Sequence, residues 1–334
     1  MPPSPEDAFH DCFQRLGYRG RHDLQRLQPS LREQLQGLQR MFNEALRNQK
    51  KVDTHAECPP FHFDFIDADD NDENAIATRN DFYSFIGVTV PLIFRISDAC
   101  VNLSRAAGLT AVLRVQPSEQ DYNELQTTLF YVLLSFIVGH EWTHHVHGHL
   151  STGAVVLREL VTDDLAESMD YQVKELAADG YSAYHTLRNL ADNWTTFLPF
   201  LKFHGSTTPE VLDETFLACF IVAIAGYMFL WPVPDVNATD IYKLSHPPQA
   251  ARLNFLMHEV IGWCRQNRPR MEEWIERQFQ TLMQVTAEAV LGRGGSVVWA
   301  KQTRFFRSPD GTAYVAELGR RIDEYRKALG ANRR

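Results

Sequence analysis

The sequence predicts an α+β protein in which helices make up most of the chain. Apolar residues recur at steps of three and four along residues 24–46 and 253–290, which is the periodicity of amphipathic helices. Two short runs between residues 75 and 90 instead have the composition of β-strands and predict a small sheet. The chain has 334 residues, 44% of them hydrophobic, so it is long enough to bury a large core.

Composition and charge patterning divide the chain into three regions. We expect a helical N-terminal region over residues 1–50, a main domain over 51–290, and a basic C-terminal extension over 291–334. The N-terminal helix should be interrupted near Pro29, because proline lacks an amide hydrogen. This region carries no catalytic pattern, so we expect it to cover part of the core or to mediate self-association.

A proline-containing connection, residues 51–62, leads into the main domain. His55 and Cys58 have the spacing of metal ligands, but no second pair lies nearby, so an ordinary loop is expected. The acidic residues from Asp67 to Glu73 hint at a calcium loop. They lack the glycine and the glutamate that such a loop requires at its sixth and twelfth positions, so we expect an acidic turn.

Two strands are expected next, over residues 75–77 and 82–90, as a hairpin. Such a hairpin could offer an edge to an extended peptide, or it could be purely structural. Residues 97–120 should then form a helix with a break at Gly108 and a loop near Pro117.

The most informative stretch is a long helix expected from about Tyr122 to Leu150, which is apolar all round and then ends in histidines. His140 and His144 lie one turn apart on one face, so their imidazoles can share one tetrahedral Zn²⁺. Glu141 lies beside them, where it can take a proton from a zinc-activated water without ligating the metal. The pattern indicates metal-assisted hydrolysis of a peptide bond. The alternative is a polar helix end with solvated histidines.

A second helix, expected over residues 171–187, carries two carboxylates four positions apart. Glu175 can supply the third zinc ligand, and Asp179 can hydrogen-bond the outer nitrogen of a ligating histidine. Alanines between them permit close approach of another helix, which favours burial over an exposed acidic pair.

A third group of polar residues follows in the segment 240–257. His246 precedes two prolines and could donate a hydrogen bond to the oxyanion of a tetrahedral intermediate. Arg252 lies one to two turns into the next helix and could pair with Asp179 or Glu175. A turn that starts a helix would also explain the His-Pro-Pro sequence.

Two further elements are expected in the C-terminal half of the chain. Residues 216–231 are apolar and uncharged, but a bilayer span needs about twenty residues, so we expect a buried core helix rather than a membrane-inserting one. Residues 296–315 should form a small hairpin around Pro309, before a final helix.

Net charge, cysteine spacing and the N-terminal sequence bear on the class of function and on the cellular compartment. The net charge of -9 argues against a general nucleic-acid binder. Five widely spaced cysteines without a Cys-x-x-Cys pair indicate reduced thiols. The N-terminus does not have the pattern of a signal peptide. We therefore expect a cytoplasmic protein; membrane association is possible but not favoured.

Four motifs in order resemble the zinc metallopeptidases of the gluzincin type that are related to the CaaX prenyl endopeptidase and the bacterial heat-shock membrane protease. The first is Asn74-Ala75-Ile76-Ala77, with Ile86-Gly87-Val88-Thr89 as the strand beside the cleft. The second is His140-Glu141-Trp142-Thr143-His144, with His149 five residues on. The third is Glu175-Leu176-Ala177-Ala178-Asp179, and the fourth is Ser245-His246-Pro247-Pro248 with Arg252.

The resemblance implies a zincin-like domain, with the small sheet beside the active-site helix, that binds one zinc ion and cleaves a peptide or protein. His140, His144 and Glu175 would ligate the metal and Glu141 would be the general base. The resemblance implies that Asp179 contacts these ligands without binding the metal. It also implies that His246 and Arg252 support the transition state or the acidic pair. Two alternatives stay open: a catalytically silent, zinc-stabilised regulatory or binding module, and a latent regulatory protease specific for one host protein.

Overall fold

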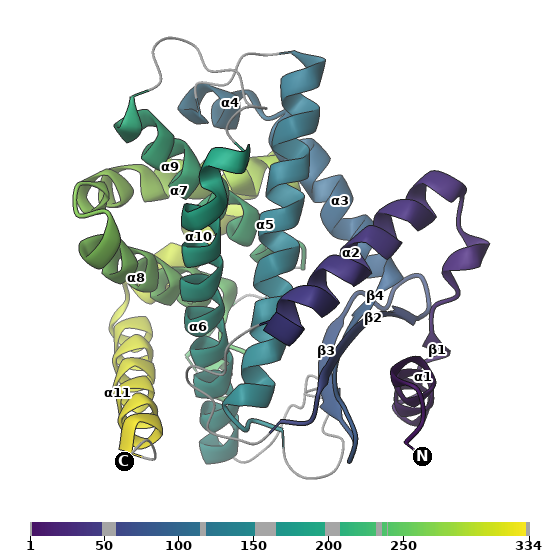
Figure 1. The fold of residues 1–334 in the computed structure, drawn as a ribbon. Helices are drawn as coiled ribbons and strands as arrows, with labels where there is room; N and C mark the ends of the chain where they lie inside the picture. Colours follow the sequence, from purple (N-terminus) through teal and green to yellow (C-terminus); the bar gives the residue numbers. More distant parts are fainter. Residues whose placement is uncertain are drawn as a thin grey trace. The chain divides into compact units, whose positions relative to one another are not determined.

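The computed structural model describes residues 2–48, 58–113, 118–150, 165–197, 208–231, 236–238 and 240–331. Most of these residues are helical, and four strands form one small mixed sheet (Figure 1). This confirms the predicted α+β class. The predictions about His55 and about a loop near Pro117 lie outside the described residues.

The chain divides into two compact units. The first contains residues 1–95, 140–158 and 327–334, and the second contains residues 96–139 and 159–326. The boundary falls inside helix α5 (Glu119–Val146), which is continuous through it.

The first unit holds the sheet, whose strand order is β1-β2-β4-β3. Strands β3 (Ala75–Arg79) and β4 (Ser84–Thr89) pair antiparallel, as predicted for the hairpin. Strand β2 (Phe61–Asp67) pairs parallel with β4, and β1 (Gly20–Arg21) pairs antiparallel with β2. The three central residues of the edge strand β3 are buried, which favours a structural role for the hairpin over an open edge.

Strand β2 corrects an expectation: Phe61 and His62 fall in the expected connection and Asp67 in the expected acidic turn, but the whole of Phe61–Asp67 is a strand. The run Phe61-His62-Phe63-Asp64-Phe65 alternates apolar and polar residues as a strand does, but its polar residues His62 and Asp64 are buried like Phe63 and Phe65. The carboxylate of Asp64 is fully buried and pairs with Arg21 of β1. A buried charge is tolerated only when it is paired, and only the tertiary fold supplies this partner.

Helices α1 (Pro5–Arg15) and α2 (Pro29–Asn48) pack on opposite faces of the sheet. Phe9 and Phe13 of α1 pack in one cluster with Ile66 of β2. Phe42 of α2 packs against Phe63 of β2, at 5.1 Å between ring centroids. Residues 63 and 66 of one strand point to opposite faces. The N-terminal region is therefore part of the core of this unit.

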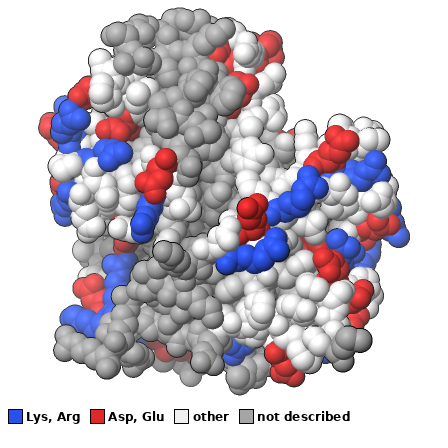
Figure 2. Space-filling view, in the orientation of Figure 1, with Lys and Arg blue, Asp and Glu red and all other residues white. Residues whose placement is uncertain are grey.

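Proline 29 is the first residue of α2, a position where its missing amide hydrogen costs nothing. The predicted break in the N-terminal region thus lies just before this residue, after a short 3-10 turn over Leu24–Arg26. The outer surface of α2 carries side chains of both charge signs (Figure 2), among them the exposed Glu33, Arg40, Glu44 and Arg47.

The second unit is helical in its described residues, apart from its connections. After α3 (Val90–Ser104), which begins in the first unit, come α4 (Ala107–Leu113), part of α5, α6 (Leu165–Phe197), α7 (Pro209–Met228), α8 (Gln249–Asn267), α9 (Met271–Leu291), α10 (Gly295–Phe306) and α11 (Pro309–Ala331). Helix α6 packs against α8, and α9 packs against both α7 and α10. The break near Gly108 is confirmed, because α3 ends and α4 begins just before it.

The hairpin predicted over residues 296–315 is wrong. This segment forms α10 and the first turns of α11. Pro309 stands at the first position of α11, and the hydroxyl of Ser308 accepts a hydrogen bond from the amide of Gly311 at 3.2 Å. Serine followed by proline starts a helix as readily as a turn, and here it caps one.

Helix α7 is the one described helix that is long and apolar enough to cross a membrane. Of its most apolar 18-residue window, 78% is buried within the protein. Such burial is typical of the core helix of a soluble protein.

Candidate metal centre

The end of α5 presents the paired histidines. His140 and His144 are buried, and their Nε2 atoms lie 3.0 Å apart. One helical turn separates them in sequence, so both rings leave the same face of the helix. Glu141 follows His140 directly and is half-buried.

His145, which follows the second histidine of the pair, fixes this end of α5 to the sheet. The Nε2–H of His145 donates to the carbonyl oxygen of Phe85 in β4, at 2.9 Å. Burial lowers the pKa of His145 to about 4, although the hydrogen bond to Phe85 acts in the opposite direction. The ring is therefore neutral near pH 7 and serves as a structural anchor.

Helix α6 approaches α5 closely just before the histidine pair. The Ser182 hydroxyl of α6 donates to the carbonyl oxygen of Phe136 at 2.7 Å. A Cβ atom at Gly139 would lie only 2.6 Å from the Ser182 Oγ, so this approach needs a residue without a side chain. The small residues of both helices thus set the distance between them.

Glu175 and Asp179 of α6 are both buried, which excludes the exposed acidic pair. The Nε2 of His246 lies 3.4 Å from a carboxylate oxygen of Glu175. Arg252 of α8 donates two hydrogen bonds to Asp179, at 2.7 and 2.8 Å. Of the two predicted partners for Arg252, Asp179 is the one that it contacts in this bidentate way.

Asp179 and Arg252 form an ion pair in which 3% and 13% of the two side chains are exposed. Burial by itself would lower the pKa of Arg252, but the carboxylate of Asp179 has the opposite effect, reinforced by Glu175, and the pKa is raised. Asp179 was expected to hydrogen-bond the outer nitrogen of a ligating histidine. That bond stays a prediction, and the two bonds from Arg252 make Asp179 a fixed counter-ion of the guanidinium.

Three predicted ligands come together. His140, His144 and Glu175 each offer one ligand atom, these atoms all lie within 4.8 Å of one another, and all three residues are buried. Two ligands of a tetrahedral zinc ion lie about 3.3 Å apart at the usual bond lengths, close to the separation of the imidazole nitrogens. Two imidazole nitrogens and one carboxylate oxygen also form a donor set that suits zinc and leaves a fourth position open. The residues present therefore fit a metal ion.

No pattern in the sequence indicates the contacts that hold the His246 segment. The buried Gln172, one turn before Glu175, donates from its Nε2 to the carbonyl oxygens of Ile241 and Leu244, at 3.1 and 2.7 Å. Its Oε1 accepts a hydrogen bond from the hydroxyl of Tyr314 in α11. The sequence offered no signal for these contacts, because Gln172 stands among other polar residues of α6 and its partners lie about 70 and 140 positions away.

We predict that Tyr314→Phe destabilises the protein by about 1–3 kcal/mol, because it leaves the buried Oε1 of Gln172 without its donor. Urea unfolding of the full chain measures this change. Tyr184→Phe is the matched control, since Tyr184 is exposed on α6. Equal stability of the Tyr314 and Tyr184 variants would show that the hydrogen bond contributes nothing.

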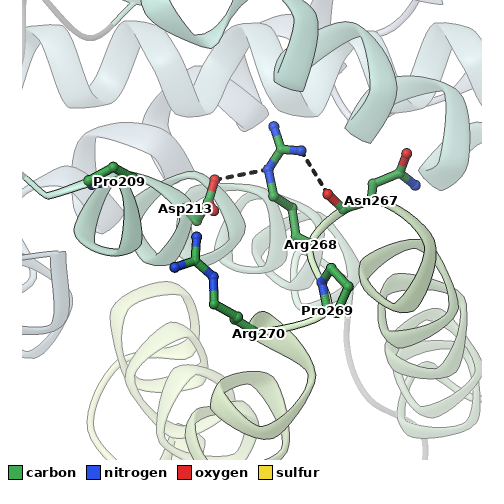
Figure 3. A pocket seen from close by; sticks show the side chains of 6 residues that line it. All are labelled: Pro209, Asp213, Asn267, Arg268, Pro269 and Arg270. Atoms are coloured by element: carbon green, nitrogen blue, oxygen red, sulfur yellow. Dashed lines mark hydrogen bonds and ion pairs between the residues drawn. The ribbon is translucent and has the colours of Figure 1, made fainter.

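A separate pocket of about 370 Å³ lies where α7 begins and α8 meets α9 (Figure 3). Arg268 at its wall donates to Asp213 at 3.1 Å, and Arg270 pairs with Glu210. None of the predicted site residues lines this pocket. Its charges are matched within the protein, so it does not compete with the metal centre as a candidate site.

Comparison with known proteins adds no relative. No protein-family model matches the chain, and no curated protein or solved structure is significantly similar to it. The function of the protein is therefore inferred from the residues of the site itself.

Proposed function

We propose that this protein is a zinc-dependent endopeptidase. The observation that carries the proposal is the buried group formed by His140, His144 and Glu175. Two histidines alone are common at helix ends, but a buried carboxylate beside them needs a cation or a hydrogen-bond donor. Zinc satisfies all three ligands at once.

The residues around the group have roles that suit peptide hydrolysis. A zinc ion held there would polarise the scissile carbonyl group and activate a water molecule. Glu141 accepts the proton of the attacking water and passes it to the leaving amine. His246 is 35% exposed on its side chain and lies beside Glu175, so it can donate a hydrogen bond to the developing oxyanion.

Arg252 and Asp179 hold this arrangement in place without taking part in the proton transfers. The guanidinium binds Asp179 through both of its oxygens and adds positive charge near Glu175. A bidentate pair of this kind restricts the orientation of both side chains. Glu175 is one helical turn from Asp179, so the same contact fixes the part of α6 that presents the ligand.

We predict that the purified protein binds one zinc ion per chain, and that Glu175→Gln lowers the affinity, since the amide is a weaker ligand than the carboxylate. Competition with a chromophoric chelator gives both values. Glu167→Gln is the matched control, because Glu167 is exposed on the same helix. Unchanged zinc affinity in the Glu175 variant would remove this residue from the ligand set.

Activity decides between the protease and a zinc-stabilised binding module. The zinc-loaded protein is incubated with a peptide library, and new N-termini are identified by mass spectrometry. Cleavage supports the protease. Persistent inactivity of the zinc-loaded protein would favour the binding module, in which the same ligands stabilise the fold.

A latent protease whose N-terminal region merely covers the cleft needs a different test from deletion of residues 1–50. Phe9, Phe13 and Phe42 of this region are buried in the core of the first unit. Removing them would expose large aromatic surfaces and unfold the unit. Limited proteolysis of the intact, zinc-loaded chain, followed by the peptide assay, tests latency without this defect.

A further inference from the structure

We propose that His149 is a positioning residue whose Nδ1 accepts a hydrogen bond from His144 and so fixes the ring and the tautomer of that ligand. The inference rests on the zinc centre proposed above and assigns its outer partner. Two independent features of the first unit carry it, one in the backbone and one in the side chains.

The backbone feature is the turn that ends α5. The amide of His149 donates to the carbonyl oxygen of His144 at 2.9 Å, and the amide of Gly148 donates to that of His145 at 3.0 Å. Gly148 has a φ of 68°, in the left-handed region. These two bonds and this glycine define a Schellman motif, in which the chain folds back over the last helical turn. The motif brings residue 149 against residue 144.

The side-chain feature is a contact between two ring nitrogens. The Nδ1 of His149 lies 2.9 Å from the Nδ1 of His144, and the ring centroids are 5.0 Å apart. Both residues are buried, with 8% and 2% of their surfaces exposed. In many Schellman motifs an apolar contact joins these two positions. Here a directional hydrogen bond takes its place.

The direction of this hydrogen bond follows from the chemistry of imidazole. A neutral imidazole carries one proton, and a nitrogen that ligates a metal must present its lone pair. The Nε2 of His144 faces His140 at 3.0 Å and is its ligating atom in the proposed centre. The proton of His144 is therefore on Nδ1, and the Nδ1 of His149 accepts it.

This contact gives His144 the outer hydrogen-bond partner that a zinc-ligating histidine normally has. A ligating histidine normally donates its other ring N–H to an acceptor, which orients the ring and raises its basicity. The Nδ1 of His149 meets the Nδ1 of His144 directly, at 2.9 Å. His149 acts through His144 and does not need to touch the metal or the substrate.

Two nearly isosteric variants separate the hydrogen bond from the packing. His149→Asn places an amide oxygen where the Nδ1 stood and keeps an acceptor. His149→Leu fills similar space without one. Both are prepared as the full chain, and their unfolding in urea is compared so that a general loss of structure is recognised.

The first measurement is made without metal. Nitrogen-15 spectra of the imidazoles report which ring nitrogen of His144 is protonated, with its signals assigned by their loss in His144→Ala. We expect the Nδ1–H tautomer in the wild type and in His149→Asn, and its loss in His149→Leu. A wild-type His144 protonated on Nε2 would overturn the proposal.

The second measurement is the affinity for zinc, with chelator competition as the readout. We expect His149→Leu to weaken binding by about 10–100-fold, the usual effect of losing an outer partner, and His149→Asn to restore most of it. Equal affinities in the wild type and the leucine variant, or equal losses in both variants, would contradict the positioning role. Failure of the wild type to bind zinc would refute the proposed function, whereas the nitrogen-15 spectra decide the role of His149 by themselves.

Discussion

Glu141→Gln is expected to slow peptide cleavage by about 10²–10⁴-fold, the usual contribution of a general base, while zinc stays bound. Glutamine has nearly the same shape as glutamate, but its amide cannot accept the proton of the attacking water. Because Glu141 is not among the three grouped ligands, the metal affinity should not change. Cleavage of a peptide found in the library screen gives the rate, and chelator competition gives the affinity.

The control is Glu124→Gln, which makes the same substitution on the same helix away from the histidines. It should cleave at the wild-type rate. Full activity of Glu141→Gln would rule out Glu141 as the base. Loss of zinc from this variant would instead show that the carboxylate contributes to binding the metal.

Asp179→Leu is expected to destabilise the protein by about 3–5 kcal/mol, the usual cost of removing one partner of a buried ion pair. The guanidinium of Arg252 would remain charged in a site where 13% of its side chain is exposed. The double variant Asp179→Leu with Arg252→Met should recover most of the loss, since it removes both charges and keeps apolar volume. Urea unfolding at constant pH measures all three proteins.

The comparison between the single and the double variant is the decisive part. A single variant as stable as the double variant would mean that Arg252 finds water or another anion without cost. Arg265→Met provides the reference for an exposed arginine, because its pair with Glu272 lies at the surface. Exposed pairs contribute little, so this variant should stay within about 1 kcal/mol of the wild type.

Local patterns predicted the elements that carry the site. The apolar run that ends in histidines predicted the buried part of α5, and two short runs with the composition of strands predicted the β3–β4 hairpin. Such predictions succeed because side-chain periodicity follows directly from backbone geometry. The same reasoning failed at Pro309, where the residues that make a turn also start a helix.

Partners far apart in sequence could not be assigned in this way. Strand β2 was missed although Phe61-His62-Phe63-Asp64-Phe65 alternates like a strand, and Arg21, the partner of its buried Asp64, lies more than forty positions away. The contact between Gln172 and Tyr314 was missed because these residues also lie far apart in sequence. In each case a polar residue looked unfavourable for a buried position until its partner was known.

By itself, the sequence determined the mostly helical class and the helix that bears His140 and His144, two side chains that can ligate a metal ion. The sequence offered Glu175 as a third ligand and Asp179 or Glu175 as the partner of Arg252. The tertiary structure decided that Glu175 joins the pair, that Arg252 binds Asp179 through both oxygens, and that His149 folds back on His144. The physical reason is that the spacing of residues along one helix is set by local geometry. Convergence of separate segments depends instead on packing and on the pairing of buried polar groups, which many distant residues determine together.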